Sequence, residues 1–132
     1  MSPSNTVVLL TSGASPAAFA AADKKGTDLA ILAVGEIIAI IDWFVLVSAT
    51  NTRQVRTIVD EVQRALRDLD GSKPIGVEGL ADATWVLLDY GDIVVHVFLE
   101  ATREYYDLDR LWADAARVDV DVPAAPLVAD GS

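Results

Sequence analysis

The apolar residues in the first half of the chain form one helical run and two runs of strand length. Ser15-Pro16 before an alanine-rich stretch is typical of a helix start, and Gly26 suits the position after the helix end. The very apolar stretch 29–49 is divided at positions 35, 36 and 42 by Gly, Glu and Asp, and its pieces are rich in β-branched residues. These pieces predict two buried strands, at about 29–34 and 43–50, with a short connector at 37–41.

The segment after the second strand has the clearest helical pattern in the chain. Asn51 is a favourable N-cap residue, and Gln54 three positions later completes a variant of the capping box. Gly71 and Pro74 end the helix. Between these signals, apolar residues recur at helical spacing on one stripe, while charged residues take the other positions. The stripe consists of Val55, Ile58, Val59, Val62, Leu66 and Leu69.

The second half of the chain is mostly strand-like. A short strand at 75–78 precedes two strong patterns at 84–89 and 93–99, and the Tyr90-Gly91-Asp92 connection between them predicts a β-hairpin. The run 93–99 is apolar at nearly every position, so both faces of the strand are apolar. This indicates a central strand that is covered on both sides. The alternation at 118–122 suits an edge strand or a dimer contact. A helix is predicted from Glu100, with one side formed by Tyr105, Leu108, Leu111 and Trp112.

This order of elements predicts a single-domain α/β sandwich with a mixed, mostly five-stranded sheet and helices on its faces. The length of 132 residues suits one domain. We assign 15–116 to the domain, 1–14 to an N-terminal segment that can be flexible, and 117–132 to a C-terminal tail expected to fray.

The charge balance bears on the choice of partner. The chain has 20 acidic and 10 basic residues, a net charge of −10. This disfavours direct sequence-specific binding to nucleic acid or to anionic lipid, and it favours a basic partner or serves solubility alone. The acid is densest at the end, where 100–132 holds eight acidic and three basic residues. Binding through these charges should weaken as the ionic strength rises.

The stretch 29–49 is long enough to cross a membrane, but Glu36 and Asp42 lie near its middle and its composition favours strands. The N-terminus lacks the basic region and hydrophobic core of a signal peptide. We therefore expect a cytoplasmic protein that does not enter membranes.

Little in the sequence is typical of catalysis. The chain has no Cys, which excludes disulfides, thiolate metal sites and a Cys nucleophile. No Gly-rich loop is followed by the Lys of a phosphate site, and Gly-x-Ser-x-Gly is absent. Asp89 and Asp92 flank the hairpin turn and are too few for a metal site. His96 lies among valines, as a core or interface histidine does. We predict no enzyme, no catalytic residue, no cofactor and no metal.

The aromatic residues are more informative, because Trp and Tyr dominate binding hot spots. We expect two of the three tryptophans, Trp43 and Trp112, to lie in the core. Surface anchors are expected at Trp85, Tyr90 and one of the pair Tyr105 and Tyr106.

Several segments between Asp28 and Trp112 match one family pattern. They are DWFV at 42–45, N-x-x-QV at 51–55, EG at 78–79, WVLLDYGDIVVHVF at 85–98 and REYYxLDRLW at 103–112. Over about two thirds of the chain, the sequence resembles the Iojap family of ribosomal silencing factors (RsfS). The resemblance implies a sheet similar to that of nucleotidyltransferases. It also implies binding to ribosomal protein L-fourteen of the large subunit, which blocks joining of the small subunit and represses translation.

The resemblance also implies where the partner is contacted. Aromatic side chains would supply desolvated area, and acidic ones would complement a basic ribosomal protein. The chain departs from the usual family pattern at Ala33, Gly35 and Ile41, where Asp, Ser and Thr are usual. The partner-binding residues carried over are Trp85, Asp89, Tyr90, His96, Tyr105, Tyr106 and Asp109.

Two alternatives stay open beside this interpretation. One is a nucleotidyltransferase-like protein that binds a nucleotide, for which only Asp89 and Asp92 could hold Mg²⁺. The other is a self-associating domain, because of the alternation at 118–122 and the surplus of aromatic residues. A homodimer is also compatible with ribosome binding.

Overall fold

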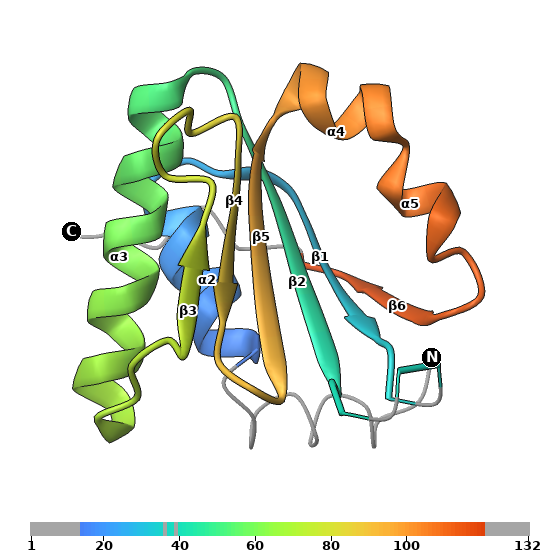
Figure 1. Ribbon diagram of the computed structural model, residues 1–132, viewed down its shortest axis with the longest axis horizontal. Coiled ribbons are helices and arrows are strands. Elements are labelled where there is room, and N and C mark those ends of the chain that lie inside the picture. Colours follow the sequence, from blue (N-terminus) through green and yellow to red (C-terminus); the bar gives the residue numbers. More distant parts are fainter. Residues whose placement is uncertain (1–13, 36, 39, 121–132) are drawn as a thin grey trace, which may run out of the picture.

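Six strands form one mixed sheet in the order β3-β4-β5-β2-β1-β6 (Figure 1). The computed structural model describes residues 14–35, 37–38 and 40–120; residues 1–13 of the expected N-terminal segment 1–14 and residues 121–132 of the expected tail 117–132 lie outside these residues. The central strands β2 and β5 are parallel, and the other neighbours are antiparallel. The strands are β1 (Thr27–Ala33), β2 (Trp43–Ala49), β3 (Gly76–Glu78), β4 (Trp85–Asp89), β5 (Ile93–Leu99) and β6 (Ala116–Asp119).

The predicted strands and the hairpin between β4 and β5 are confirmed, and the stretch 29–49 is indeed divided into two strands. The sixth strand, β6, pairs antiparallel with β1 and forms one edge of the sheet. This confirms the edge-strand interpretation as far as Asp119, so the ordered sheet continues past the predicted start of the tail at 117. The likeness of the sheet to that of nucleotidyltransferases stays a prediction.

The helices lie on both sides of the sheet. α2 (Ala14–Asp23) and α3 (Thr52–Asp70) cover one face, while α4 (Glu100–Tyr106) and α5 (Leu108–Leu111) lie on the other side (Figure 1). The predicted helix after 100 is interrupted at Asp107, which has a left-handed backbone (φ 52). Because of this break, Leu108 is buried while Tyr105 and Leu111 are exposed, so their predicted common side is wrong.

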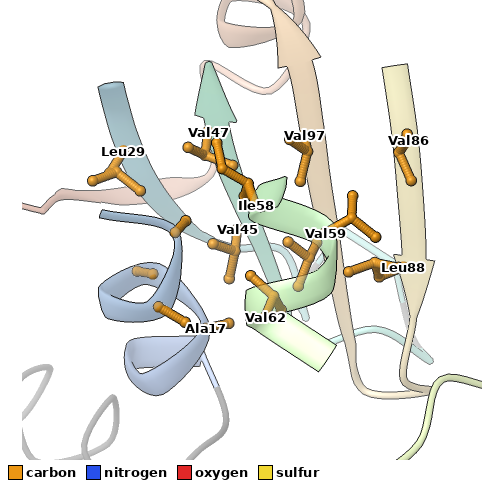
Figure 2. Packing of buried hydrophobic residues seen from close by; sticks show 14 of the residues in the cluster. Ala17, Leu29, Val45, Val47, Ile58, Val59, Val62, Val86, Leu88 and Val97 are labelled. Atoms are coloured by element: carbon orange, nitrogen blue, oxygen red, sulfur yellow. The ribbon is translucent and has the colours of Figure 1, made fainter. Parts of the chain in front are cut away.

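The main core lies between the sheet and the pair α2 and α3. Small alanines of α2 and the aliphatic stripe of α3 meet valines and leucines of four strands, as Figure 2 shows for Val59 and Val62 above the sheet. The predicted stripe of α3 is buried from Val55 to Leu66, but Leu69 in the last turn is 58% exposed. This face is therefore almost purely aliphatic.

The junction between α2 and α3 depends on Gln54. Asn51 caps α3 as predicted, and its Oδ1 accepts the Gln54 backbone N–H at 2.8 Å. The Gln54 side chain does not reach back to the N-cap residue but accepts from the Thr50 N–H, and its Nε2 donates to the carbonyls of Lys24 and Lys25. The left-handed residue after α2 is Lys25 (φ 68), whereas Gly26 is required by space, since a Cβ there would lie 2.4 Å from Val47.

Candidate protein interface on the open face of the sheet

The face of the sheet opposite α2 and α3, here called the open face, is only partly covered by α4 and α5. Alternate residues of the strands point to it, because successive side chains of a strand lie on opposite faces. The strand register aligns Phe44, Val94 and Asp89 in one row and Leu46, His96 and Leu87 in the next. The open face therefore combines apolar, aromatic and polar side chains.

An aromatic cluster occupies this face. The Trp85 ring lies 5.6 Å from Phe98, 6.1 Å from His96 and 5.2 Å from Tyr106, measured between ring centroids. Phe44 makes edge contacts with His96 at 4.7 Å and with Trp112 at 5.1 Å. All three tryptophans are half-buried, and Trp43 and Trp112 pack against the two clusters of buried residues, which agrees with their expected place in the core. The aromatic cluster consists of Phe44, Trp85, His96, Phe98, Tyr106 and Trp112.

His96 lies at the middle of the aromatic cluster and is only 7% exposed. Its Nδ1 accepts a hydrogen bond from Trp85 Nε1 at 3.2 Å, while its buried Nε2 has no hydrogen-bond partner among the described residues. Burial lowers the pKa of His96 from 6.5 to about 4, so the ring is neutral near pH 7. A direct partner contact by His96 therefore requires a group that reaches into the sheet surface.

A groove of about 220 Å³ opens next to this histidine. Phe44, Leu87 and Val94 supply its apolar lining beside His96. Glu78 and Asp89 contribute exposed carboxylates, and one oxygen of Asp89 accepts the Gly91 N–H at 2.8 Å. The groove therefore combines an apolar lining with a local negative charge.

Two tyrosines of α4 extend the surface beyond the groove. Tyr106 is 54% exposed and packs on Trp85, and Tyr105 is 81% exposed with its ring edge-on to Tyr106 at a centroid distance of 5.0 Å. Exposed aromatic rings that are held by one another are ready for contact with a partner. The structure thus brings Trp85, Asp89, Tyr105 and Tyr106 to one side of the molecule, as expected.

Tyr90 is not part of this surface. It lies in the turn after β4 and packs against the core of the covered face, where burial raises the pKa of its hydroxyl. Tyr90 therefore does not lie beside Trp85 on the open face, because the hairpin turn places it near Arg67 and Asp70 of α3, and its assignment as a partner contact stays a prediction. Its buried hydroxyl has no hydrogen-bond partner among the described residues.

Asp109 has a structural task. Its carboxylate pairs with Arg103 at 3.1 Å and with Arg117 at 3.2 Å. Partial burial is the largest single influence and would raise the pKa of Asp109, but the charges and hydrogen bonds of Arg103 and Arg117 together outweigh it and lower the pKa. Arg103 is buried and donates to the Asp28 carbonyl and to Ser48 Oγ. This network fastens α4 and α5 to β1 and β2, so Asp109 positions the tyrosines rather than offering a free carboxylate.

The groove contains residues that the sequence analysis did not select. Phe44 and Leu87 were assigned to strands, and Glu78 was noted only as part of the family pattern. Their common position follows from the register of β2, β5, β4 and β3, which pairs Glu78 with Leu87 and Leu87 with His96. Alternation along a strand decides on which face each residue lies, but the order of the strands was needed to bring these residues together.

The departures from the family pattern lie at two places. Ile41 lines the groove beside His96. Ala33 and Gly35 line a separate, wider cavity of about 570 Å³ together with Asp42, Trp43 and Asp114. The substitution at Ile41 is therefore the one that changes the candidate interface, by making it more apolar.

Two further properties of the described residues, 14–35, 37–38 and 40–120, are relevant to function. None of their helices is both long enough and apolar enough to span a membrane. No three His, Asp or Glu side chains among them gather as a metal site requires.

Comparisons with known proteins give a consistent picture. The family model described as "Ribosomal silencing factor during starvation" matches residues 10–130. The chain is 38% identical over 105 residues to "Ribosomal silencing factor RsfS" of Bacillus subtilis, covering 80% of this chain and 88% of that protein. It is 32% identical over 91 residues to the mouse "Mitochondrial assembly of ribosomal large subunit protein 1", covering 67% and 40%. A crystal structure from Chromobacterium violaceum is similar with a TM-score of 0.73 and 32% identity, covering 86% and 94%.

Proposed function

The chain belongs to the ribosomal silencing factor (RsfS) family, and we propose that it binds ribosomal protein L-fourteen of the large subunit and thereby blocks joining of the small subunit. The observation that carries the proposal is the aromatic cluster on the open face, which continues into the exposed Tyr105 and Tyr106. Translation is repressed because subunits that cannot join cannot begin synthesis. The protein acts in the cytoplasm, where these subunits are found.

The chemistry of the open face supports a protein partner. Trp85 is half-buried and Tyr106 is 54% exposed, so a partner can desolvate both rings at little cost in side-chain entropy. Leu87 and Phe44 add apolar area within the groove. Such a centre surrounded by polar groups is the usual anatomy of a protein interface.

The charges near this surface favour a basic protein over RNA. Glu78 and Asp89 lie at the groove, and Glu100, Glu104 and Asp107 are exposed on or next to α4. Carboxylates speed the encounter with a basic partner and repel phosphate. An acidic protein can therefore act on the ribosome by docking on a basic ribosomal protein.

The mechanism is steric and needs no catalytic residue. A folded domain of 14.1 kDa that is held on the face where the two subunits meet occupies space that the small subunit requires. The strength of repression then depends on affinity and on the position of the bound domain. Arg103 holds α4 and α5 against the sheet through its hydrogen bonds and its ion pair. The tyrosines of α4 are therefore fixed relative to the domain, so a partner that binds them keeps the domain in one orientation.

The test measures binding and subunit joining separately. Purified large subunits are sedimented with the wild-type chain, with Trp85→Ala and with Tyr105→Ala, and joining is followed by light scattering after small subunits are added. We expect the wild type to co-sediment and to prevent joining, and both variants to do so less. Leu69→Ala, which removes an exposed apolar side chain of α3, is the matched control. Absence of wild-type binding at low salt would contradict the proposal.

The salt dependence tests the role of charge in the same assay. If carboxylates of the open face meet a basic protein, the affinity should fall steadily as the ionic strength rises, since exposed charges are screened within about 8–10 Å at physiological salt. An affinity that stays constant from low to high salt would mean that binding is carried by the aromatic contacts alone.

A further inference from the structure

The loop 79–84 between β3 and β4 links the helical side of the molecule to the aromatic cluster. It directly precedes Trp85, which is the first residue of β4, and it lies next to α3 (Figure 1). The side chain of Arg56, from α3 on the covered face, reaches this loop. Its Nη2 donates to the carbonyl oxygens of Leu80 at 3.1 Å and of Ala81 at 3.0 Å. A helix of one face is thus bonded to the segment that leads into the aromatic cluster of the other face.

The conformation of this loop requires support from its surroundings. Ala83 is fully buried and has a left-handed backbone (φ 56), which is unfavourable for a residue that carries a Cβ atom. Gly79 is also left-handed (φ 91), and its carbonyl accepts the Ala83 N–H at 2.9 Å. A strained segment persists only where its contacts hold it. The two hydrogen bonds of Arg56 are contacts of this kind.

The start of the loop packs directly against the backbone of Trp85. A Cβ atom at Gly79 would lie 2.1 Å from the Trp85 carbonyl oxygen, so no space separates the two segments. A displacement of the loop at Gly79 therefore moves the start of β4 as well. The Trp85 indole is sensitive to such a movement, because its hydrogen bond to His96 Nδ1 is already long at 3.2 Å and its ring packs on Tyr106.

We propose that Arg56 is a positioning residue for Trp85, although it belongs to the helix on the other face of the sheet. Its hydrogen bonds to the loop 79–84 keep the start of β4 in place, and the Trp85 indole is thereby held in the orientation that the partner binds. Arg56 itself does not contact the partner. The inference rests on the proposed function, in which Trp85 is a partner contact.

Two replacements of Arg56 test whether its hydrogen bonds matter. Arg56→Met keeps an apolar stem but removes the donors, and its affinity for purified large subunits should fall about three- to tenfold, the usual effect of one hydrogen bond. Arg56→Lys keeps a charged donor and should stay within about twofold of the wild type. Arg53→Met removes the same charge from another exposed residue of α3 and should leave the affinity unchanged. Thermal unfolding shows that each variant is folded at the assay temperature.

A double-mutant cycle tests whether Arg56 acts through Trp85. In the Trp85→Ala background, Arg56→Met should cause no further loss of affinity, because the side chain that Arg56 positions is absent. The indole N–H signals in a ¹H–¹⁵N correlation spectrum give a second readout in the free protein. The Trp85 signal, assigned by its absence in Trp85→Phe, should shift in Arg56→Met as the bond to His96 changes, while the signals of Trp43 and Trp112 stay in place. A general loss of stability would not select one indole.

The outcomes separate this inference from the proposed function. If the wild type fails to bind large subunits, both are overturned. If the wild type binds and Arg56→Met binds equally well, the proposed function stands and the positioning role is wrong. The role is also wrong if Arg56→Met causes its full loss in the Trp85→Ala background or leaves the Trp85 signal unchanged, since Arg56 would then act without Trp85. Equal losses in Arg53→Met and Arg56→Met, or in Arg56→Lys and Arg56→Met, would likewise overturn it, because the hydrogen bonds to the loop would not be the cause.

Discussion

The two faces of the sheet are made from alternate residues of the same strands, yet they differ in chemistry. The covered face meets α2 and α3 through valine, isoleucine, leucine and alanine (Figure 2). The open face carries two tryptophans, two phenylalanines, a histidine whose Nε2 has no hydrogen-bond partner among the described residues, and a groove with two carboxylates. The aliphatic face is covered by two helices of the chain, whereas the open face carries an aromatic cluster whose outer members, Tyr105 and Tyr106, are exposed.

The difference indicates a division of tasks. A side chain of the covered face contributes to the free energy of unfolding, since it is surrounded by other side chains. An exposed side chain of the open face, such as Tyr105 or Tyr106, can be changed at smaller cost to folding, and its loss is expected to appear in the affinity for the partner. Mutations on the two faces should therefore separate stability from binding.

The largest effect is expected on the covered face. Ile58 of α3 is fully buried, and Ile58→Ala should lower the free energy of unfolding by about 2–5 kcal/mol, because it removes apolar contacts and leaves a cavity. Chemical denaturation measures the loss. The folded fraction should bind large subunits as the wild type does, and Leu69→Ala, at a 58% exposed position, should cost less than about 0.5 kcal/mol. A specific loss of affinity in Ile58→Ala would refute the division.

The next effect depends on pH and belongs to the open face. His96 titrates at about 4 in the folded chain and at 6.5 when it is exposed. The unfolded chain therefore binds a proton first, and stability that is complete above pH 6.5 declines as the pH falls to about 4, by up to about 3 kcal/mol.

Unfolding free energies of the wild type and of His96→Asn, measured between pH 7 and pH 4, test this expectation. The groove carboxylates of Glu78 and Asp89 are present in both proteins, so the difference between the two curves isolates His96. The variant should show a shallower decline than the wild type. Parallel curves would show that the histidine is not protected from protonation.

The smallest effect on stability is expected at the exposed end of the aromatic cluster. Tyr106 is 54% exposed, so Tyr106→Ala should cost about 1 kcal/mol or less of unfolding free energy, the usual value of one aromatic pair. Its affinity for large subunits should nevertheless fall about tenfold, since aromatic anchors dominate interfaces. Phe19→Ala, at a 49% exposed position of α2, is the matched control on the other side. Equal affinities of the two variants would remove the tyrosine from the interface.

Most of the fold could be predicted from local patterns. The β-branched runs gave the strands, and Asn51 with Gly71 gave both ends of α3, because capping is decided by a few neighbouring residues. The break at Asp107 could not be predicted, because the chain around it has helical composition and the turn is held by contacts that are distant in sequence. Arg103 makes those contacts, with Asp28 and Ser48.

The candidate site was predicted less completely. Trp85, Asp89, Tyr105 and Tyr106 were selected from their residue types and the family pattern, and the structure places them on one side of the molecule; their contact with a partner stays a prediction. The side of the sheet on which Tyr90 lies could not be predicted, since the direction of a turn residue depends on the turn geometry. The groove itself was missed because its residues come from four strands.

The sequence by itself determined the family, the strands, the long helix and the acidic, aromatic character of the protein, because these depend on residue types and short spacings. Only the tertiary structure decided which residues share the open face, that Asp109 pairs with Arg103 and Arg117, and that His96 is buried and accepts a hydrogen bond from Trp85. The reason is that strand order and register join segments far apart in the chain. Burial and hydrogen bonding of the imidazole exist only after those segments have met.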